Sequence, residues 1–148
     1  MRLSVVIPAL NEERHLGQLL SDIKRQSRRP EELIVVDAGS TDATVHIAQK
    51  SGAIVLHSEP PVARGRNLGG YSAKGDLIFF LDADTRLPGT FLEDFVCDIE
   101  RRRLDIACPR YLSEVCQERS ISSFLEGCTG IPKGVHSYEH LRSGWHNA

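Results

Sequence analysis

Four short apolar runs alternate with segments of helical pattern through the first half of the chain. Short apolar runs bounded by turn residues predict buried strands, and apolar spacings of three and four residues predict helices. Strands that alternate with helices are typical of a parallel sheet with crossover helices. We therefore predict an α/β fold with a mostly parallel sheet and helices on both faces. The four predicted strands are Leu3–Ile7, Glu32–Val36, Ala53–Leu56 and Leu77–Leu81.

The segment after the first strand has the pattern of an amphipathic helix. Pro8 is expected to stop the strand, because proline has no backbone N–H for a sheet. Asn11 is a suitable N-cap, and Glu12 and Glu13 would lie in the first turn, where acidic side chains are favourable. One apolar face follows at helical spacing, formed by Leu16, Leu19, Leu20 and Ile23.

Two further helices are predicted before the fourth strand. Ser40 or Thr41 would cap the first of them, and Gly52 would end it. The second is a short helix over Arg64–Lys74, whose basic, glycine-containing start would let guanidinium groups and backbone approach a phosphate closely. A surface helix with incidental arginines is the alternative.

The C-terminal part carries weaker signals. A short strand is predicted at Asp105–Cys108 and a helix at residues 115–127. We expect one domain over residues 1–148, with a core at 1–108 and an irregular or helical extension at 109–148. Before that extension a helix is predicted, with an apolar face formed by Phe91, Leu92, Phe95, Val96 and Ile99.

Two carboxylates, Asp82 and Asp84, follow the run Leu77–Leu81, which we expect to be a central strand buried on both faces. Carboxylates this close repel each other, and a divalent cation removes the repulsion. Oxygen ligands suit Mg²⁺ or Mn²⁺, and ligands of open α/β sheets lie outside the carboxyl ends of strands. The sequence therefore predicts a metal-phosphate site here. The alternative is that Asp82 begins a turn and Asp84 caps the next segment.

Composition excludes several classes of function. A net charge of −2 gives no electrostatic footprint for nucleic acid. The longest apolar run is too short to span a bilayer, and residues 3–7 form a strand and not a signal peptide. The four cysteines contain no Cys-x-x-Cys, which favours reduced thiols in a cytoplasmic protein over two disulfides in an exported one.

Several motifs occur in a definite order: Val6–Glu12, Val35–Asp42, Arg66–Gly69, Ala73–Asp76 and Leu81–Asp84. Over about residues 1 to 96 this order resembles the family 2 glycosyltransferases with the GT-A fold. The resemblance implies a Rossmann-like sheet. It also implies transfer of a sugar, with inversion, from a nucleotide diphosphate that is usually UDP or GDP.

The resemblance assigns nucleotide-binding roles residue by residue. Pro8, Ala9 and Glu12 match the motif that lines the base and ribose. Asp37 matches an acid that contacts the base, and Arg66 matches an arginine near the nucleotide.

The same resemblance makes Asp82 and Asp84 the catalytic pair. Asp82 would face the ribose and donor sugar, and Asp84 would hold Mg²⁺ or Mn²⁺ on the diphosphate. Positive charge from the metal and from Arg66 or Arg64 would stabilise the nucleoside diphosphate that leaves.

The chain also departs from the family pattern. Leu10 replaces a common aromatic residue and Gly65 a common alanine. The chain is short for the family, and no recognisable acidic general base or acceptor half follows Asp84. A non-catalytic or partner-dependent nucleotide-sugar module is therefore the second hypothesis. A lipid-linked acceptor at a membrane surface and self-association stay open.

A sugar nucleotidyltransferase is the third hypothesis. That class requires a glycine-rich loop with a lysine near the first strand. Residues 8–14 contain neither glycine nor lysine, which argues against it.

Overall fold

The structure is a computed structural model, and it describes residues 1–109. The chain divides into two compact units, Met1–Leu92 and a second that begins at Glu93, and each is described by itself. The predicted helix at 115–127 and the extension at 109–148 lie outside the described residues, apart from residue 109. The single domain with a core at 1–108 stays a prediction.

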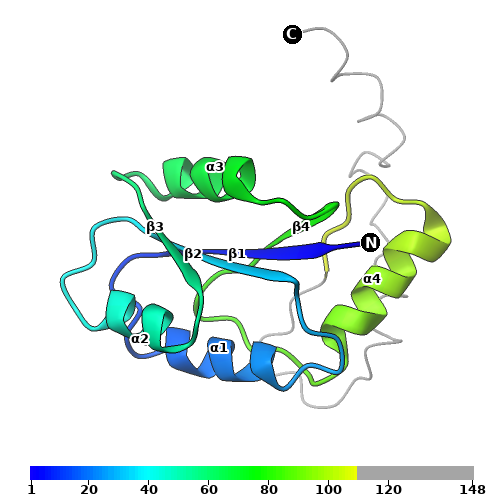
Figure 1. Ribbon diagram of the computed structural model, residues 1–148, viewed down its shortest axis with the longest axis horizontal. Coiled ribbons are helices and arrows are strands. Elements are labelled where there is room, and N and C mark those ends of the chain that lie inside the picture. Colours follow the sequence, from blue (N-terminus) through cyan, green and yellow to red (C-terminus); the bar gives the residue numbers. More distant parts are fainter. Residues whose placement is uncertain (110–148) are drawn as a thin grey trace, which may run out of the picture. The chain divides into compact units, whose positions relative to one another are not determined.

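The first unit is built on a parallel sheet, as the sequence predicts. Its strand order is β3-β2-β1-β4, and every neighbouring pair is parallel (Figure 1). The strands are β1 (Leu3–Ala9), β2 (Glu32–Asp37), β3 (Ile54–His57) and β4 (Leu77–Phe80).

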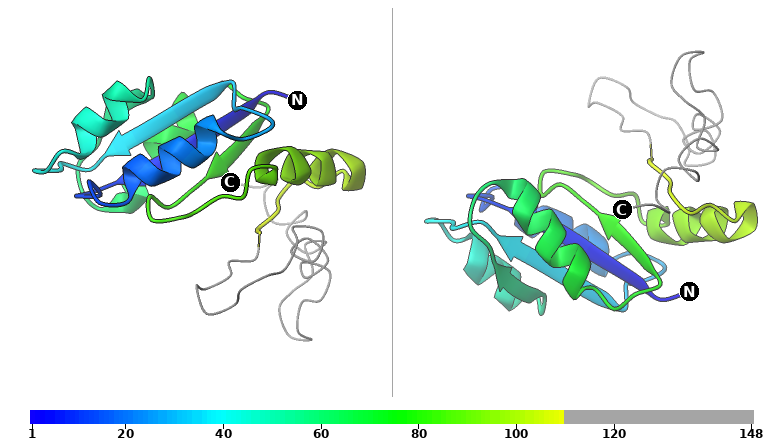
Figure 2. Two further views of the ribbon diagram at one scale, coloured as in Figure 1. Left: turned by 90° about the horizontal axis from the view of Figure 1, so that it is seen from below. Right: turned by 90° about the horizontal axis from the view of Figure 1, so that it is seen from above.

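Helices cover both faces of this sheet, which confirms the predicted layering. α1 (Leu16–Lys24) and α2 (Thr44–Lys50) lie on one face, and α3 (Val62–Ser72) lies on the other (Figures 1 and 2). The predicted inner face of α1 is buried, and β1 is buried along its whole length. Because β1 and the last four residues of β2 are buried, the core lies on both sides of these two strands. Each fully buried aliphatic side chain adds about 1.5–3 kcal/mol to the free energy of unfolding.

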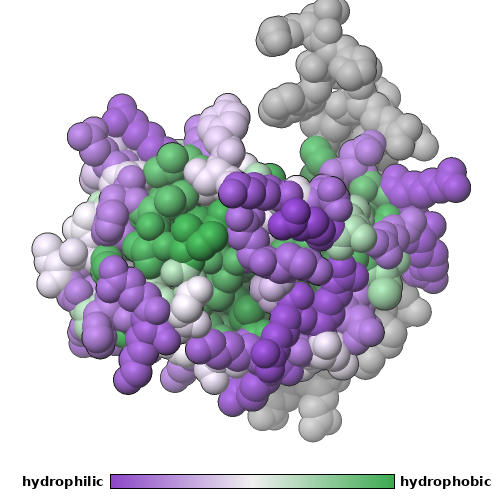
Figure 3. Space-filling view, viewed as in Figure 1, coloured by the Kyte–Doolittle hydropathy of each residue, from purple (hydrophilic) through white to green (hydrophobic). Residues whose placement is uncertain are grey.

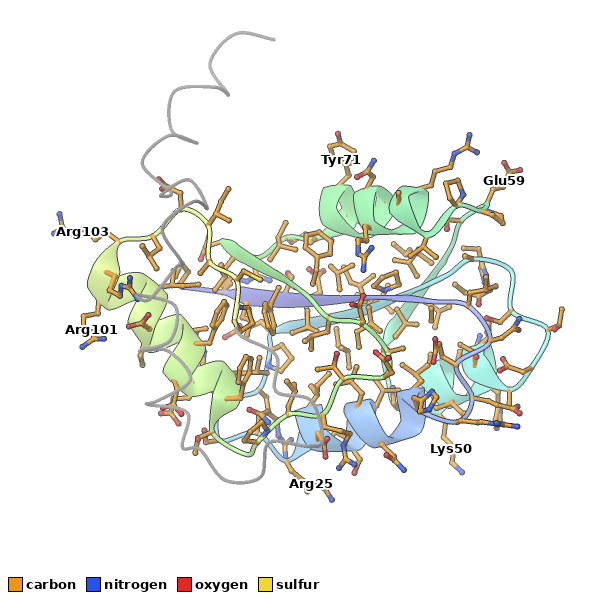
Figure 4. All side chains as sticks on the ribbon, turned by 180° about the vertical axis from the view of Figure 1, so that it is seen from behind. Arg25, Lys50, Glu59, Tyr71, Arg101 and Arg103 are labelled. Carbon is orange, nitrogen blue, oxygen red and sulfur yellow. The ribbon has the colours of Figure 1, made fainter. Side chains whose placement is uncertain are left out.

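α3 lies close to the sheet because two glycines face it. A Cβ on Gly69 would overlap Cγ1 of Val6 and come within 3.0 Å of Cγ2 of Val36. A Cβ on Gly65 would lie 3.2 Å from the hydroxyl of Ser58. Residues four apart share one face of a helix. The opposite face of α3 is open, and Tyr71, which is 91% exposed, points away from the sheet there (Figure 4).

Within residues 1–109, β4 is an edge strand of the four-stranded sheet and not the central strand that its apolar run predicts. Phe80 is 40% exposed, and Leu77 and Ile78 are partly exposed. At the other edge, Figure 3 shows apolar surface over β3, where Ile54 is 49% exposed. The interior strands of this part of the chain are β1 and β2. Apolar content alone does not determine the order of strands, so the prediction that β4 is buried on both faces was wrong.

Pro8 does not stop the first strand, which continues to Ala9. The carbonyl of Val6 accepts a hydrogen bond from the N–H of Leu81, so Val6 faces β4. Pro8 lies two residues on and faces the same side, beyond the last register pair of β1 with β4. Its missing N–H therefore costs no bond to that strand.

Both predicted helix starts were placed too early. α1 begins at Leu16, after a turn in which the N–H groups of His15 and Leu16 donate to the carbonyl of Glu12. α2 begins at Thr44, and the N-cap residues of the two helices, His15 and Ala43, make no side-chain cap bond. The N–H of Thr44 donates to the side chain of Asp42 at 2.9 Å. The cap candidates bond to one another across two loops instead, as described below. Gly52, with φ 84°, follows α2 as predicted.

The described part of the second unit is mostly helical. α4 (Phe91–Arg102) starts in the last two residues of the first unit, and its predicted apolar positions are buried. Asp98 is 7% exposed and accepts hydrogen bonds from Arg101 and Arg102 at 2.6 and 3.1 Å. The strand predicted at Asp105–Cys108 is not formed. That run has one strongly β-favouring residue, Ile106, which is 55% exposed.

No helix within residues 1–109 combines the length and apolar character needed to cross a bilayer.

Candidate functional site

The candidate site lies where β2, β1 and β4 end side by side. β1 pairs with both neighbours, and Ala9 at its end is in register with Asp37 at the end of β2. Asp82 and Asp84 lie two and four residues beyond the end of β4 at Phe80. Because all three strands are parallel, their carboxyl ends meet at one edge, where open α/β sheets bind ligands.

Asp37 is a buried carboxylate that organises the turn after β2. It is 3% exposed and accepts hydrogen bonds from the N–H groups of Gly39 at 3.2 Å and Ser40 at 3.1 Å. Burial raises the pKa of Asp37, but hydrogen bonds from the side chain and backbone of Ser40 and from Gly39 outweigh it and lower this pKa. Asp37 is therefore ionised at neutral pH.

His57 is a site residue that the sequence did not suggest. Its Nδ1 lies 3.4 Å from Oδ2 of Asp37, and its side chain is 67% exposed. The contact follows from the register, which pairs Asp37 with His57 across β2 and β3. No spacing rule within the sequence predicts a register between strands 20 residues apart, so this partner could be found only from the fold.

Two loops at this edge are joined by side-chain hydrogen bonds. The N–H of Asn11 donates to the hydroxyl of Ser40 at 2.9 Å, and the N–H of Glu12 donates to the hydroxyl of Thr44 at 2.8 Å. In return the Asn11 side chain accepts from the N–H of Thr41 at 2.9 Å. Asn11 has a left-handed φ of 56°, a conformation that asparagine tolerates. The residues predicted as helix caps therefore fix the two loops beside the site.

The three predicted base-lining residues differ in accessibility. Pro8 and Ala9 are buried in β1, whereas Glu12 is partly exposed in the following loop. The Glu12 carboxylate lies 3.2 Å from Nδ1 of His15 on its own loop. The structure thus places all three at the same edge without a direct contact from the Glu12 side chain to Asp37.

Arg66 and Asp82 are brought into direct contact. The guanidinium of Arg66, on α3, donates to Oδ1 of Asp82, and the two side chains are 45% and 56% exposed. An exposed pair of this kind contributes little to stability. A guanidinium has five N–H donors, so Arg66 keeps donors for a ligand while it holds Asp82.

The segment after β4 turns both carboxylates outward. The carbonyl of Asp82 accepts from the N–H of Thr85 at 3.1 Å, and Ala83 is 4% exposed between the exposed Asp82 and Asp84. Asp82 therefore begins a turn, as the alternative interpretation predicts, and both carboxylates of this turn point outward.

The donor set fits a divalent cation shared with a ligand. Carboxylate oxygens are hard ligands suited to Mg²⁺ or Mn²⁺. Within residues 1–109 no three metal-binding side chains gather at one place. A cation at Asp84 would therefore draw most of its oxygens from water and from a bound diphosphate, as Mg²⁺ commonly does.

The Gly75-Asp76 pair that precedes β4 lies at the opposite edge of the sheet. The N–H of Gly75 donates to the hydroxyl of Ser4 at 2.9 Å, and Asp76 accepts from the N–H of Arg2 at 2.7 Å. A Cβ on Gly75 would lie 2.7 Å from the backbone nitrogen of Ser4. This part of the motif therefore joins strand starts and does not contribute to the site.

The lowered pKa of Asp37 predicts a pH dependence of stability. A carboxylate with a lowered folded pKa stabilises the fold above its ordinary pKa of 3.8, and this contribution is lost as the pH falls through the lowered value. In urea unfolding between about pH 5 and pH 2, the Asp37→Asn chain should lose less stability than the unmodified chain. Parallel curves for the two chains would contradict this expectation.

The chain matches one protein family along most of its length. Residues 4–127 match the family described as Glycosyl transferase family 2. The chain is 31% identical over 149 residues to the undecaprenyl-phosphate 4-deoxy-4-formamido-L-arabinose transferase of Pseudomonas fluorescens, covering 86% of this chain and 42% of the relative. The chain thus spans about two fifths of that relative's length.

Solved structures share the fold. The crystal structure of S. aureus TarS 1-349 in complex with UDP-GlcNAc has a TM-score of 0.60 and 28% identity, covering 70% of this chain and 32% of that one. The crystal structure of M. tuberculosis glucosyl-3-phosphoglycerate synthase has a TM-score of 0.55 and 31% identity, covering 67% and 40%. The described sheet and helices therefore have the GT-A architecture, and the chain belongs to glycosyl transferase family 2.

Proposed function

We propose that the protein transfers a sugar from a UDP- or GDP-linked donor, with inversion at the anomeric carbon, using a divalent cation held by Asp84. The observation that carries this proposal is the Arg66–Asp82 contact beside the outward Asp84 at the carboxyl edge of the sheet. A guanidinium and two carboxylates at the carboxyl edge of a parallel sheet support this proposal, because open α/β sheets bind ligands at that edge. The UDP-GlcNAc complex of TarS supports the donor class.

The base and ribose would lie over the ends of β1 and β2, near Pro8, Ala9 and Glu12. Asp37 would receive a hydrogen bond from the base. Its carboxylate already accepts bonds from the turn and lies against His57. The exposed imidazole of His57 can move aside more easily than the backbone of the turn, so a base would take its place.

The diphosphate would lie between Arg66 and Asp84. A bound Mg²⁺ or Mn²⁺ would neutralise the charge that develops on the departing nucleoside diphosphate. Arg66 would donate hydrogen bonds to phosphate oxygens, and Asp82 would orient Arg66 and face the ribose and donor sugar. These residues act by holding the donor in position for attack.

Transfer breaks the bond between the anomeric carbon and a phosphate oxygen and forms a bond to an acceptor hydroxyl on the opposite face. The acceptor proton must pass to a general base. None of the predicted site residues is assigned as this general base. The second candidate function is a non-catalytic or partner-dependent module that binds the same donor, and it differs from the first in requiring no such base.

Three finer assignments accompany the proposal. A lipid-linked acceptor agrees with the undecaprenyl-phosphate in the name of the Pseudomonas fluorescens relative. Self-association could complete the site from a second copy. A cytoplasmic location would supply nucleotide sugars and keep the thiols reduced.

Calorimetric titration of the chain with UDP, GDP and their sugar conjugates tests the proposal. With Mn²⁺ present we expect binding of one nucleotide, and with a chelator we expect that binding to be lost. Hydrolysis or transfer of the sugar would then separate the enzyme from the binding module. Absence of binding to every nucleotide, or binding unaffected by the chelator, would contradict the proposal.

A further inference from the structure

The segment that follows Asp84 has no regular structure up to α4, yet it is bonded closely to α1. Nε of Arg86 donates to Oδ2 of Asp22 at 2.6 Å, and a terminal nitrogen of the same guanidinium donates to Oδ1 at 3.2 Å. The N–H of Leu87 adds a weaker bond to the same carboxylate at 3.4 Å. One side chain on α1 therefore holds both a side chain and the backbone of this segment.

Asp22 is well suited to this contact because it is buried and ionised. It is 5% exposed, and Arg25, labelled in Figure 4 at the end of α1, donates to it at 2.7 Å. The hydrogen bond from Arg86 holds the pKa of Asp22 below its ordinary value, against the opposing effect of burial. Charge-assisted, paired hydrogen bonds are strong and directional.

Gln26, one turn further along the chain, holds the next part of the segment. Its Nε2 donates to the carbonyl of Pro88 at 2.6 Å, and its Oε1 accepts from the N–H of Leu92 at 3.0 Å. Gln26 is 4% exposed. The neighbouring N–H of Ser27 donates to the carbonyl of Gly89 at 2.8 Å. Two buried polar side chains are thus directed at the backbone after the site.

These bonds limit where Asp84 can lie. On one side the N–H of Leu81 is fixed to β1, and on the other side Arg86 and Leu87 are fixed to Asp22. Four residues, 82–85, span the gap, and one of them, Ala83, is buried. Apolar packing could supply comparable stability, but polar bonds to a particular backbone position select one conformation.

We propose that Asp22 and Gln26 are positioning residues of the Asp82–Asp84 site, which fix the segment after Asp84 so that its carboxylate is held ready for a metal-bound diphosphate. Neither residue touches the ligand in this role. The identity of the ligand in this inference rests on the proposed function. The anchoring of the segment can be measured without any ligand.

The test compares Asp22→Ala and Gln26→Leu with Asp98→Ala in the full chain. Asp98 is a matched control because it is another buried aspartate with two arginine partners, both on its own helix. Without ligand, we expect faster hydrogen exchange in peptides covering residues 82–90 of the Asp22 and Gln26 variants alone. With Mn²⁺ and UDP or GDP, we expect their affinity to fall about tenfold, as is common when a group that orients a metal ligand is lost.

The outcomes separate the two proposals. If the unmodified chain binds a nucleotide with metal and the Asp22 and Gln26 variants bind it equally well, or if Asp98→Ala weakens binding as much, the positioning role is overturned and the proposed function stands. If the unmodified chain binds none, the proposed function falls and this role with it. Should Asp22→Ala not fold, Asp22→Asn keeps an acceptor oxygen and should show a smaller loss in both measurements.

Discussion

Replacing Gly69 with alanine should lower the free energy of unfolding by about 1–3 kcal/mol. The added methyl group would overlap Cγ1 of Val6 and approach Cγ2 of Val36, which are both fully buried. A β-branched side chain in a strand has few alternative rotamers, so the overlap can be relieved only by moving α3 away from the sheet. That movement would also carry Arg66 away from Asp82. Urea unfolding followed by circular dichroism measures the loss.

Gly17→Ala is the matched control for this prediction. Gly17 lies in α1, and a Cβ there would make an ordinary contact of 3.7 Å with Cγ2 of Ile47. Alanine is favoured over glycine inside a helix by about 1 kcal/mol, so this variant should be as stable as the unmodified chain or more stable. Equal stability of the two variants would mean that the close approach of α3 to the sheet is not required.

Local patterns along the sequence predict much of the first unit. The four apolar runs predict the four strands. The buried face of α1 is predicted because residues three and four apart share one face of a helix, as do Leu16, Leu19, Leu20 and Ile23. Element ends are harder, since Asn11 and Ser40 can cap a helix or bond across loops, and tertiary contacts decide between the two. Strand order is not encoded locally either, so the apolar run of β4 predicts a buried strand but not its position in the sheet.

The site also contains residues that local patterns predict and residues that they do not. Asp37, Asp82 and Asp84 are visible in the sequence because each acid follows an apolar run, and the structure places all three at one edge. His57 and Asp22 are not visible, since their partners are set by a strand register and by a loop that crosses α1. Their roles follow from pairing between distant segments, which no local pattern contains.

Replacing Asp84 with asparagine should abolish the metal dependence of nucleotide binding. Asparagine keeps the size of the side chain but removes the charge that attracts a divalent cation. Because the remaining ligands would come from water and phosphate, loss of this carboxylate should weaken metal binding by at least about 100-fold. Titration with UDP or GDP in Mn²⁺ should then give the same affinity as titration with a chelator. Since Asp84 is exposed, stability should change by less than about 0.5 kcal/mol.

Asp76→Asn supplies the control, because it removes the same charge from the other end of β4. Asp76 is exposed and accepts a hydrogen bond from the N–H of Arg2, a contact that asparagine can keep. This variant should bind nucleotide and metal like the unmodified chain. If both variants lost binding equally, the effect would come from overall charge. If Asp84→Asn kept metal-dependent binding, Asp84 would not be the metal ligand, and the cation would have to be held by Asp82 or by phosphate alone.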